Sequence, residues 1–159
     1  MKKNPVSLIV FIFLFFFSIN VATAQHDYTW DYYKISMTLP SDFKVTRNTD
    51  TEFDAVGQGM ELMMDVFADK KVTLAEMKQA TLDYVKGLKL DHVDEVQNIK
   101  DDDFQGKYVL GAKGKDAIMI AGLIVPHSST NIWVVITFDD GDANAEADGL
   151  KILGSLVSH

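Results

Sequence analysis

The chain contains no cysteine. This absence excludes disulfide bridges, thiolate metal ligands, a thiol nucleophile and a lipid-modified N-terminal cysteine. Positive charge is also scarce, because 15 lysines and arginines face 23 aspartates and glutamates, and no basic cluster offsets the excess locally. Such a chain repels phosphate backbones and anionic headgroups, so neither nucleic acid nor a membrane surface is an expected partner.

The first 24 residues have the three parts of a secretory signal peptide. Lys2 and Lys3 form the positive start, residues 6–19 form the apolar stretch, and Ala22-Thr23-Ala24 is a small-x-small cleavage site. An apolar stretch of about 14 residues makes roughly 21 Å of helix, well short of the ~30 Å hydrocarbon core of a membrane. We therefore predict cleavage, export to the periplasm or the medium, and no membrane insertion of the processed protein.

Cleavage after residue 24 removes two lysines and no acidic residue, so the formal net charge of −8 becomes −10. Residues 25–32 are expected to form a loosely held N-terminal arm. Residues 33–159 contain no repeat, low-complexity tract or linker. They are expected to form a single domain, which at this size can bury a core of its own.

Alternating apolar and polar residues predict several half-buried strands in the first half of this domain. The strands are expected at 33–39, 43–45, 51–56 and 60–67. Phe43 and Val45 should face inward. Turns rich in glycine, proline, asparagine and aspartate separate the strands.

A helix is predicted from residue 73 to residue 89. Thr73 can cap its N-terminus with Glu76 as the reciprocal partner of a capping box, and Val72 and Met77 are placed as a hydrophobic staple. Its buried stripe is expected at Leu74, Met77, Thr81, Tyr84 and Leu88.

Two later segments, 117–125 and 132–138, are apolar at nearly every residue. Strands of this kind are typical of a sheet that is covered on both faces, so these two should be central. One cover is the helix at 73–89, and the other is a second helix at 143–157 that Asp142 is placed to cap. The predicted fold class is α+β, a three-layer α/β/α sandwich with a central, mostly antiparallel sheet between the two helices.

A polar edge strand is expected at 92–100 and a solvated turn at 101–103. Three features of the chain are distinctive together: a strand ending in a Leu-Pro turn (ISMTLP, 35–40), a helix opened by Thr73-Leu74, and a C-terminal Leu153-Gly154-Ser155-Leu156. In this order of elements the chain resembles the PsbP-like superfamily, which includes the PsbP, Mog and DcrB-like proteins. The resemblance implies an α/β/α sandwich and a non-enzymatic binding or accessory role, and it carries over no catalytic residue.

The sequence shows no catalytic, cofactor-binding or metal-binding signature. The acidic stretch 139–146 fails as an EF-hand loop, because Ala145 stands where glycine is needed and Lys151 where a bidentate glutamate is needed. The four histidines, at 26, 92, 127 and 159, are dispersed, and Ser128 beside His127 lacks a nucleophile motif.

The remaining suspects have plain structural interpretations. Met60 and Met64 should fill the core with Met63 pointing the other way, rather than bind a soft metal. Glu61 and Asp65 share one face of a strand, where solvation explains them. If the protein were an enzyme, the acidic face around Asp65 and the turn residues Asp139 and Asp140 would be the first candidates.

Tyr28, Trp30 and Tyr32, next to Tyr33, form the densest aromatic patch of the chain. Two roles are open for this patch: contact with a binding partner, and packing against the edge of the sheet, which we favour. A binding surface would show as a continuous exposed patch that includes Trp30.

We expect an exported, soluble, non-catalytic accessory or binding protein of the bacterial cell envelope, with an envelope protein as its partner and no cofactor. One alternative is a carrier of a small apolar ligand, which would need a cavity lined by Met37, Met64 or Tyr84. A metal-dependent hydrolase is the other alternative.

Overall fold

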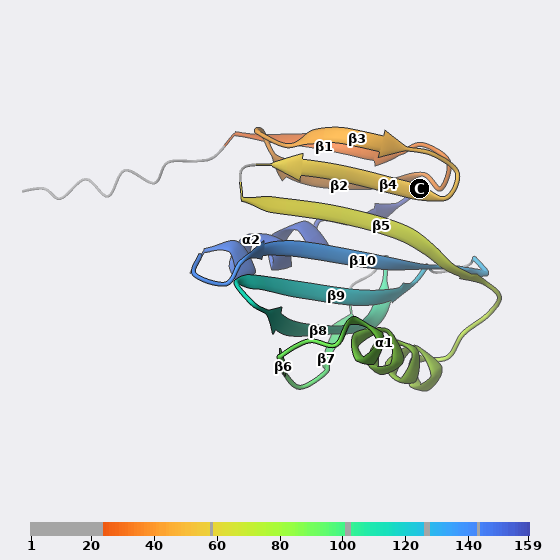
Figure 1. Ribbon diagram of the computed structural model, residues 1–159. Helices are drawn as coiled ribbons and strands as arrows, with labels where there is room; N and C mark the ends of the chain where they lie inside the picture. The colour runs from red at the N-terminus through yellow and green to blue at the C-terminus, as the bar shows by residue number, and fades with distance from the viewer. Residues whose placement is uncertain (1–23, 58, 101–102, 126–127, 143) are drawn as a thin grey trace, which may run out of the picture.

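The computed structural model describes residues 24–57, 59–100, 103–125, 128–142 and 144–159 (Figure 1). The predicted signal peptide lies outside these residues except for Ala24, as do His127 and most of the predicted turn at 101–103. Among the described residues, no helix has the length and apolarity needed to cross a membrane.

Two sheets form the β-structure, and all pairings between their described strands are antiparallel. The large sheet has the order β3-β4-β5-β10-β9-β8-β6, and β7 also pairs with β8. Its strands are β3 (Lys44–Asn48), β4 (Glu52–Gly57), β5 (Met60–Asp69), β6 (His92–Val93), β7 (Gln97–Lys100), β8 (Gln105–Lys113), β9 (Asp116–Ile124) and β10 (Thr130–Asp139). The small sheet has the order β1-β2-β11. Its strands are β1 (Gln25–Trp30), β2 (Ile35–Pro40) and β11 (Val157–Ser158).

The two continuously apolar segments are the central strands β9 and β10, as predicted. Successive residues of β9 enter different cores, because Met119 and Ala121 belong to one apolar cluster and Ile120 to the other. The large sheet is therefore buried on both faces where these strands lie.

Helix α1 (Leu74–Leu88) covers one face of the large sheet. Its capping box is present, since the Thr73 hydroxyl accepts a hydrogen bond from the Glu76 amide at 3.2 Å and the Glu76 carboxylate accepts one from the Thr73 amide at 2.8 Å. The predicted stripe was wrong at Leu74, which is exposed, whereas Val85 is buried. The true buried face of the helix is rotated toward Met77, Thr81 and Val85.

Helix α2 (Ala145–Leu153) lies on the opposite face together with the small sheet, which confirms the predicted sandwich. The helix is shorter than predicted, because Ser155 binds the backbone of Thr38 and the chain then joins β2 as β11. Leu150 in α2 and Val157 in β11 are exposed.

The predicted capping role of Asp142 needs correction. Asn144 is the N-cap residue of α2 and makes no side-chain cap bond. The Asp142 carboxylate accepts a hydrogen bond from the Asn144 amide at 2.9 Å. Asp142 thus orders the turn before the helix rather than its first turn.

The expectation of a loose arm at 25–32 was wrong. Residues 25–30 form β1, which pairs with β2 along its whole length, and Trp30 is fully buried. The pairing with β2 orders residues 25–30. The sequence of this segment is mostly polar and gives no local sign of that pairing. Val45, predicted to face inward, is exposed on the edge strand β3, while Phe43 is buried as expected.

Candidate functional site

Helix α1 leaves part of its face of the large sheet open. The helix packs on β8 and β9, at the opposite end of the sheet from β3, β4 and β5 (Figure 1). Its Tyr84 ring reaches Trp133 in β10. No described helix covers the same face of β3, β4 and β5. This end of the sheet is therefore available to another molecule.

The open surface is acidic. Glu52 and Asp54 in β4 and Glu61 and Asp65 in β5 lie on it, because residues two apart in a strand share a face. The register places Glu52 opposite Asp65. We call these four carboxylates, together with Arg47 of β3, the acidic face.

Arg47 is bound within the acidic face. Its guanidinium pairs with Glu52 and, at 3.2 Å from Nε, with Asp54 Oδ2. The hydrogen bond that Arg47 donates to Glu52 and the negative charges of Glu52 and Asp54 raise the pKa of Arg47. Its charge is thus already matched by two carboxylates.

Asp54 is incompletely paired. Its Oδ1 is buried and has no hydrogen-bond partner among the residues that the structure describes. Burial raises the pKa of the Asp54 carboxyl, Arg47 opposes this shift, and Glu52 adds to it. A buried acceptor without a donor is costly, so the Asp54 carboxylate is held on this face at a cost in free energy.

The Asp65 side chain has no hydrogen bond or ion pair within the part of the chain that the structure describes. Its pKa is raised, first by burial and then by repulsion from Glu52 and Asp54, against the attraction of Arg47. The pKa of Tyr84 is raised by burial and by the charge of Asp65, so this ring from α1 lies within electrostatic reach of the carboxylate.

Aromatic rings border Asp65. Trp133 is its cross-strand partner in β10. The ring centroids of Phe67 and Tyr84 lie 4.8 Å and 4.9 Å from that of Trp133. An unpaired carboxylate beside aromatic faces is an arrangement suited to a cationic group, because the carboxylate and the rings both attract positive charge.

The aromatic patch suggested as a partner-binding surface is used mainly inside the molecule. The Tyr28 hydroxyl donates to the Phe43 carbonyl at 3.0 Å, and Trp30 Nε1 donates to the Thr49 carbonyl at 2.5 Å. These bonds attach the small sheet to the edge of the large one. A continuous exposed patch that includes Trp30 does not form, although Tyr32 is 65% exposed.

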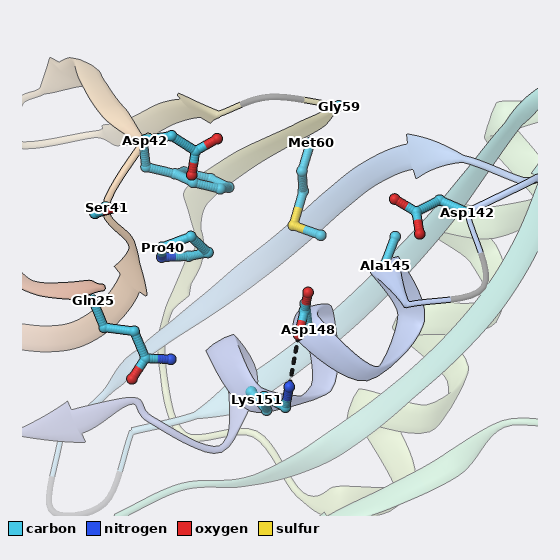
Figure 2. Close-up of a pocket in the computed structure, with 11 residues that line it drawn as sticks. Gln25, Pro40, Ser41, Asp42, Gly59, Met60, Asp142, Ala145, Asp148 and Lys151 are labelled. Atoms are coloured by element: carbon cyan, nitrogen blue, oxygen red, sulfur yellow. Dashed lines mark hydrogen bonds and ion pairs between the residues drawn. The ribbon is translucent and has the colours of Figure 1, made fainter. Parts of the chain in front are cut away.

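A polar cleft lies beside the start of α2 and has a volume of about 610 Å³. Figure 2 shows Met60 pointing between Asp42 on one side and Asp142 and Ala145 on the other, with Asp148 paired to Lys151 below. The cleft mixes carboxylates, an ion pair and a few apolar groups. This lining does not specify one class of ligand.

The other sequence candidates stay apart. Asp139 is exposed and accepts a hydrogen bond from the Gly141 amide at 2.8 Å, as a turn residue does. His92 pairs with Asp94 at the surface, and His159 forms a hydrogen bond with Ser36 in β2 of the small sheet. Among the described residues, no three carboxylate or imidazole groups converge as metal ligands would.

The methionines and the strand carboxylates fall where the alternation placed them. Met64 is fully buried and Met60 packs against the same core, while Met63 belongs to the core under α1. Asp65 is on the predicted face with Glu61, but Asp54 and Arg47 were not anticipated. The register between β4 and β5 would have been the signal for β4, because it pairs Glu52 with Asp65 and so places Asp54, two residues after Glu52, on the same face.

Comparison with known proteins identifies the fold. No protein-family model matches the chain, and no curated protein matches it. Among solved structures, the Saccharomyces cerevisiae Ran-binding protein Mog1p superposes with a TM-score of 0.58 at 9% identity, over 86% of this chain and 96% of that one. A Mog1 point variant gives a TM-score of 0.55 at 10% identity, over 85% and 96%. A Bacteroides thetaiotaomicron protein gives 0.48 at 14% identity, over 85% of this chain and 48% of that one. The chain therefore has the Mog1/PsbP-like fold that its order of elements predicted.

Proposed function

We propose that this chain is an exported, non-catalytic protein-interaction module that serves as an accessory protein of the bacterial cell envelope. The observation that carries the proposal is the acidic face, which the fold leaves open beside α1. An uncovered acidic sheet surface attracts partners of complementary charge. Mog1p, which shares the fold, is itself described as a Ran-binding protein, and this supports a binding role without indicating the partner here.

The proposal of export rests on residues 1–24. Their charge, apolar stretch and cleavage site are those of a secretory signal peptide. The processed protein would carry a large negative charge and no lipid-acceptor cysteine, which favours a soluble protein in the envelope or the medium.

Two features weigh against the alternatives. Met37 and Met64, the predicted lining of a ligand cavity, are fully buried within the packed core. Asp65, the leading catalytic suspect, accepts no hydrogen bond that would orient it for general acid or base chemistry. A carrier and a hydrolase are therefore less well supported than an interaction module.

The test is photo-crosslinking in the exporting host. A photoreactive amino acid replaces Glu61 on the acidic face in one variant and the exposed Leu150 on α2 in a matched control. We expect a defined protein adduct from position 61 and none from position 150, together with an intact mass that begins at Gln25. Adducts of equal yield from both positions, or turnover in hydrolase panels that depends on Asp65, would contradict the proposal.

A further inference from the structure

We propose that the acidic face binds a basic segment of the partner protein, with an arginine side chain of that segment placed against Asp65 and Tyr84. This inference rests on the proposed function and specifies the chemistry of the partner. It depends on the charge, pairing and aromatic surroundings of the described residues on this face.

Charge complementarity favours a cationic occupant. The acidic face holds four carboxylates, and Arg47 is already bound to Glu52 and Asp54. Lys44 lies farther along β3, opposite Val56. Asp65 is thus left with an excess of negative charge around it, which an approaching cation would relieve.

Pairing indicates where the donors are missing. The Asp65 side chain has no hydrogen-bond or ion-pair partner within the described chain. Asp65 and its cross-strand neighbour Glu52 are both partly exposed carboxylates, so a group with several N–H bonds can reach them from solvent. Arginine carries five donors in a planar fork, which suits it to two carboxylates at once.

The aromatic border favours arginine over a compact ammonium group. The rings of Tyr84 and Phe67 contact that of Trp133, the cross-strand partner of Asp65, and both rings are partly exposed. A guanidinium stacks on such rings while its edge bonds a carboxylate. Arg47 already provides an example on this surface, because its guanidinium spans two carboxylates of β4.

Other occupants fit less well. A second copy of this chain would bring its own net negative charge to an acidic surface, which opposes self-association there. An apolar ligand would bury Asp65 without a partner. A basic protein segment satisfies the charge, the missing donors and the rings together.

The experiment is an NMR titration of the isotope-labelled, processed protein purified from its exporting host. The probe is a blocked peptide of alternating glycine and arginine, and the matched peptide carries citrulline, which has a similar shape without the charge. The variants are Asp65→Asn and Tyr84→Leu. Asp116→Asn is the control, because Asp116 is an exposed aspartate at the start of β9 and its replacement changes the net charge equally.

We expect saturable shifts of the amides at Asp65, Met63 and Tyr84 with the arginine peptide and none with the citrulline peptide. Asp65→Asn should weaken binding about fivefold, the size expected of a partly exposed charge pair, and Asp116→Asn should leave it unchanged. Tyr84→Leu should weaken it through loss of the ring while Asp65 keeps its charge.

Equal binding by Asp65→Asn and Asp116→Asn, equal binding of the citrulline peptide, or shifts confined to other acidic surfaces would overturn the inference. These results are separable from a failure of the proposed function. A crosslinked partner at position 61 with no arginine binding at Asp65 would reject only the inference. Arginine binding with no crosslinked partner would reject the proposed function.

Discussion

Replacing Gly122 with alanine should destabilise the protein, because the added methyl group has no space. A Cβ at this position would lie 2.4 Å from Met77 Sδ and 2.6 Å from Trp133 Cζ3. Gly122 is on the central strand β9 directly under α1, and its cross-strand partner in β10 is Trp133. The glycine therefore allows the helix and the indole ring to approach the sheet closely.

Neither neighbour can move cheaply. Met77 is fully buried, and the indole of Trp133 is in contact with the rings of both Phe67 and Tyr84. Overpacking of a well-packed core costs about 1–3 kcal/mol, and two constrained neighbours place Gly122→Ala toward the upper end of that range. For a domain of this size such a loss lowers Tm by roughly 5–10 °C.

Gly87→Ala is the matched control for this prediction. Gly87 is exposed near the end of α1, and a Cβ there meets no atom within 4 Å. Alanine in a helix is favoured over glycine by about 0.5–1 kcal/mol, so the control should stabilise the protein. Urea unfolding of both variants gives the measurement. A Gly122→Ala variant as stable as the wild type would refute the packing proposed between α1 and β9.

Three further variants test separate parts of the account. Thr73→Ala removes the hydroxyl of the capping box with Glu76 and should lower the free energy of unfolding by about 1 kcal/mol, as measured by denaturant titration. An unchanged free energy of unfolding would mean that the cap does not stabilise α1. Trp30→Phe removes the bond to the Thr49 carbonyl and part of a buried ring, and should cost on the order of 2 kcal/mol by the same assay; a cost near zero would argue that the small sheet is not anchored there. Asp65→Asn should raise stability at neutral pH by roughly 0.5 kcal/mol, because the folded state raises the pKa of this carboxyl and so disfavours its charged form. This gain in stability should shrink as the pH falls through the folded-state pKa of Asp65 and vanish below the ordinary aspartate pKa of 3.8. Unfolding curves over a pH series measure it, and a gain in stability that is independent of pH would contradict this cause.

The predictable parts of the fold are those specified by local sequence. The start of α1 follows from Thr73 and Glu76, which satisfy each other's backbone and side chain within one turn. The centre of the sheet follows from β9 and β10, whose apolar residues on both faces require two covering layers.

The elements that were missed depend on distant partners. β1 begins with polar residues and is ordered by its register with β2, and β11 consists of two residues that pair with β2 after α2 ends. The buried stripe of α1 includes Val85 rather than Leu74, because the crossing of the helix over β8 and β9 sets its rotation. Such packing choices are not contained in a periodic pattern.

The candidate site could be predicted only in part. Alternation placed Glu61 and Asp65 together, but their surroundings arise from pairing between strands. An irregularity in β3 between Val45 and Arg47 brings Arg47 opposite Asp54. The sequence pattern within one strand gives no sign of that irregularity. It nevertheless decides that Arg47 pairs with Glu52 and Asp54 and that the Asp65 side chain stays unpaired.

The most direct test of the central claim is the affinity of the partner captured by crosslinking, measured for Asp65→Asn and Asp116→Asn at low and high salt. We expect Asp65→Asn to raise the Kd about fivefold at low salt and Asp116→Asn to leave it unchanged. The difference between the two Kd values should become smaller at high salt. A partner that binds both variants equally, with no dependence on salt, would contradict the claim that the acidic face is the binding surface.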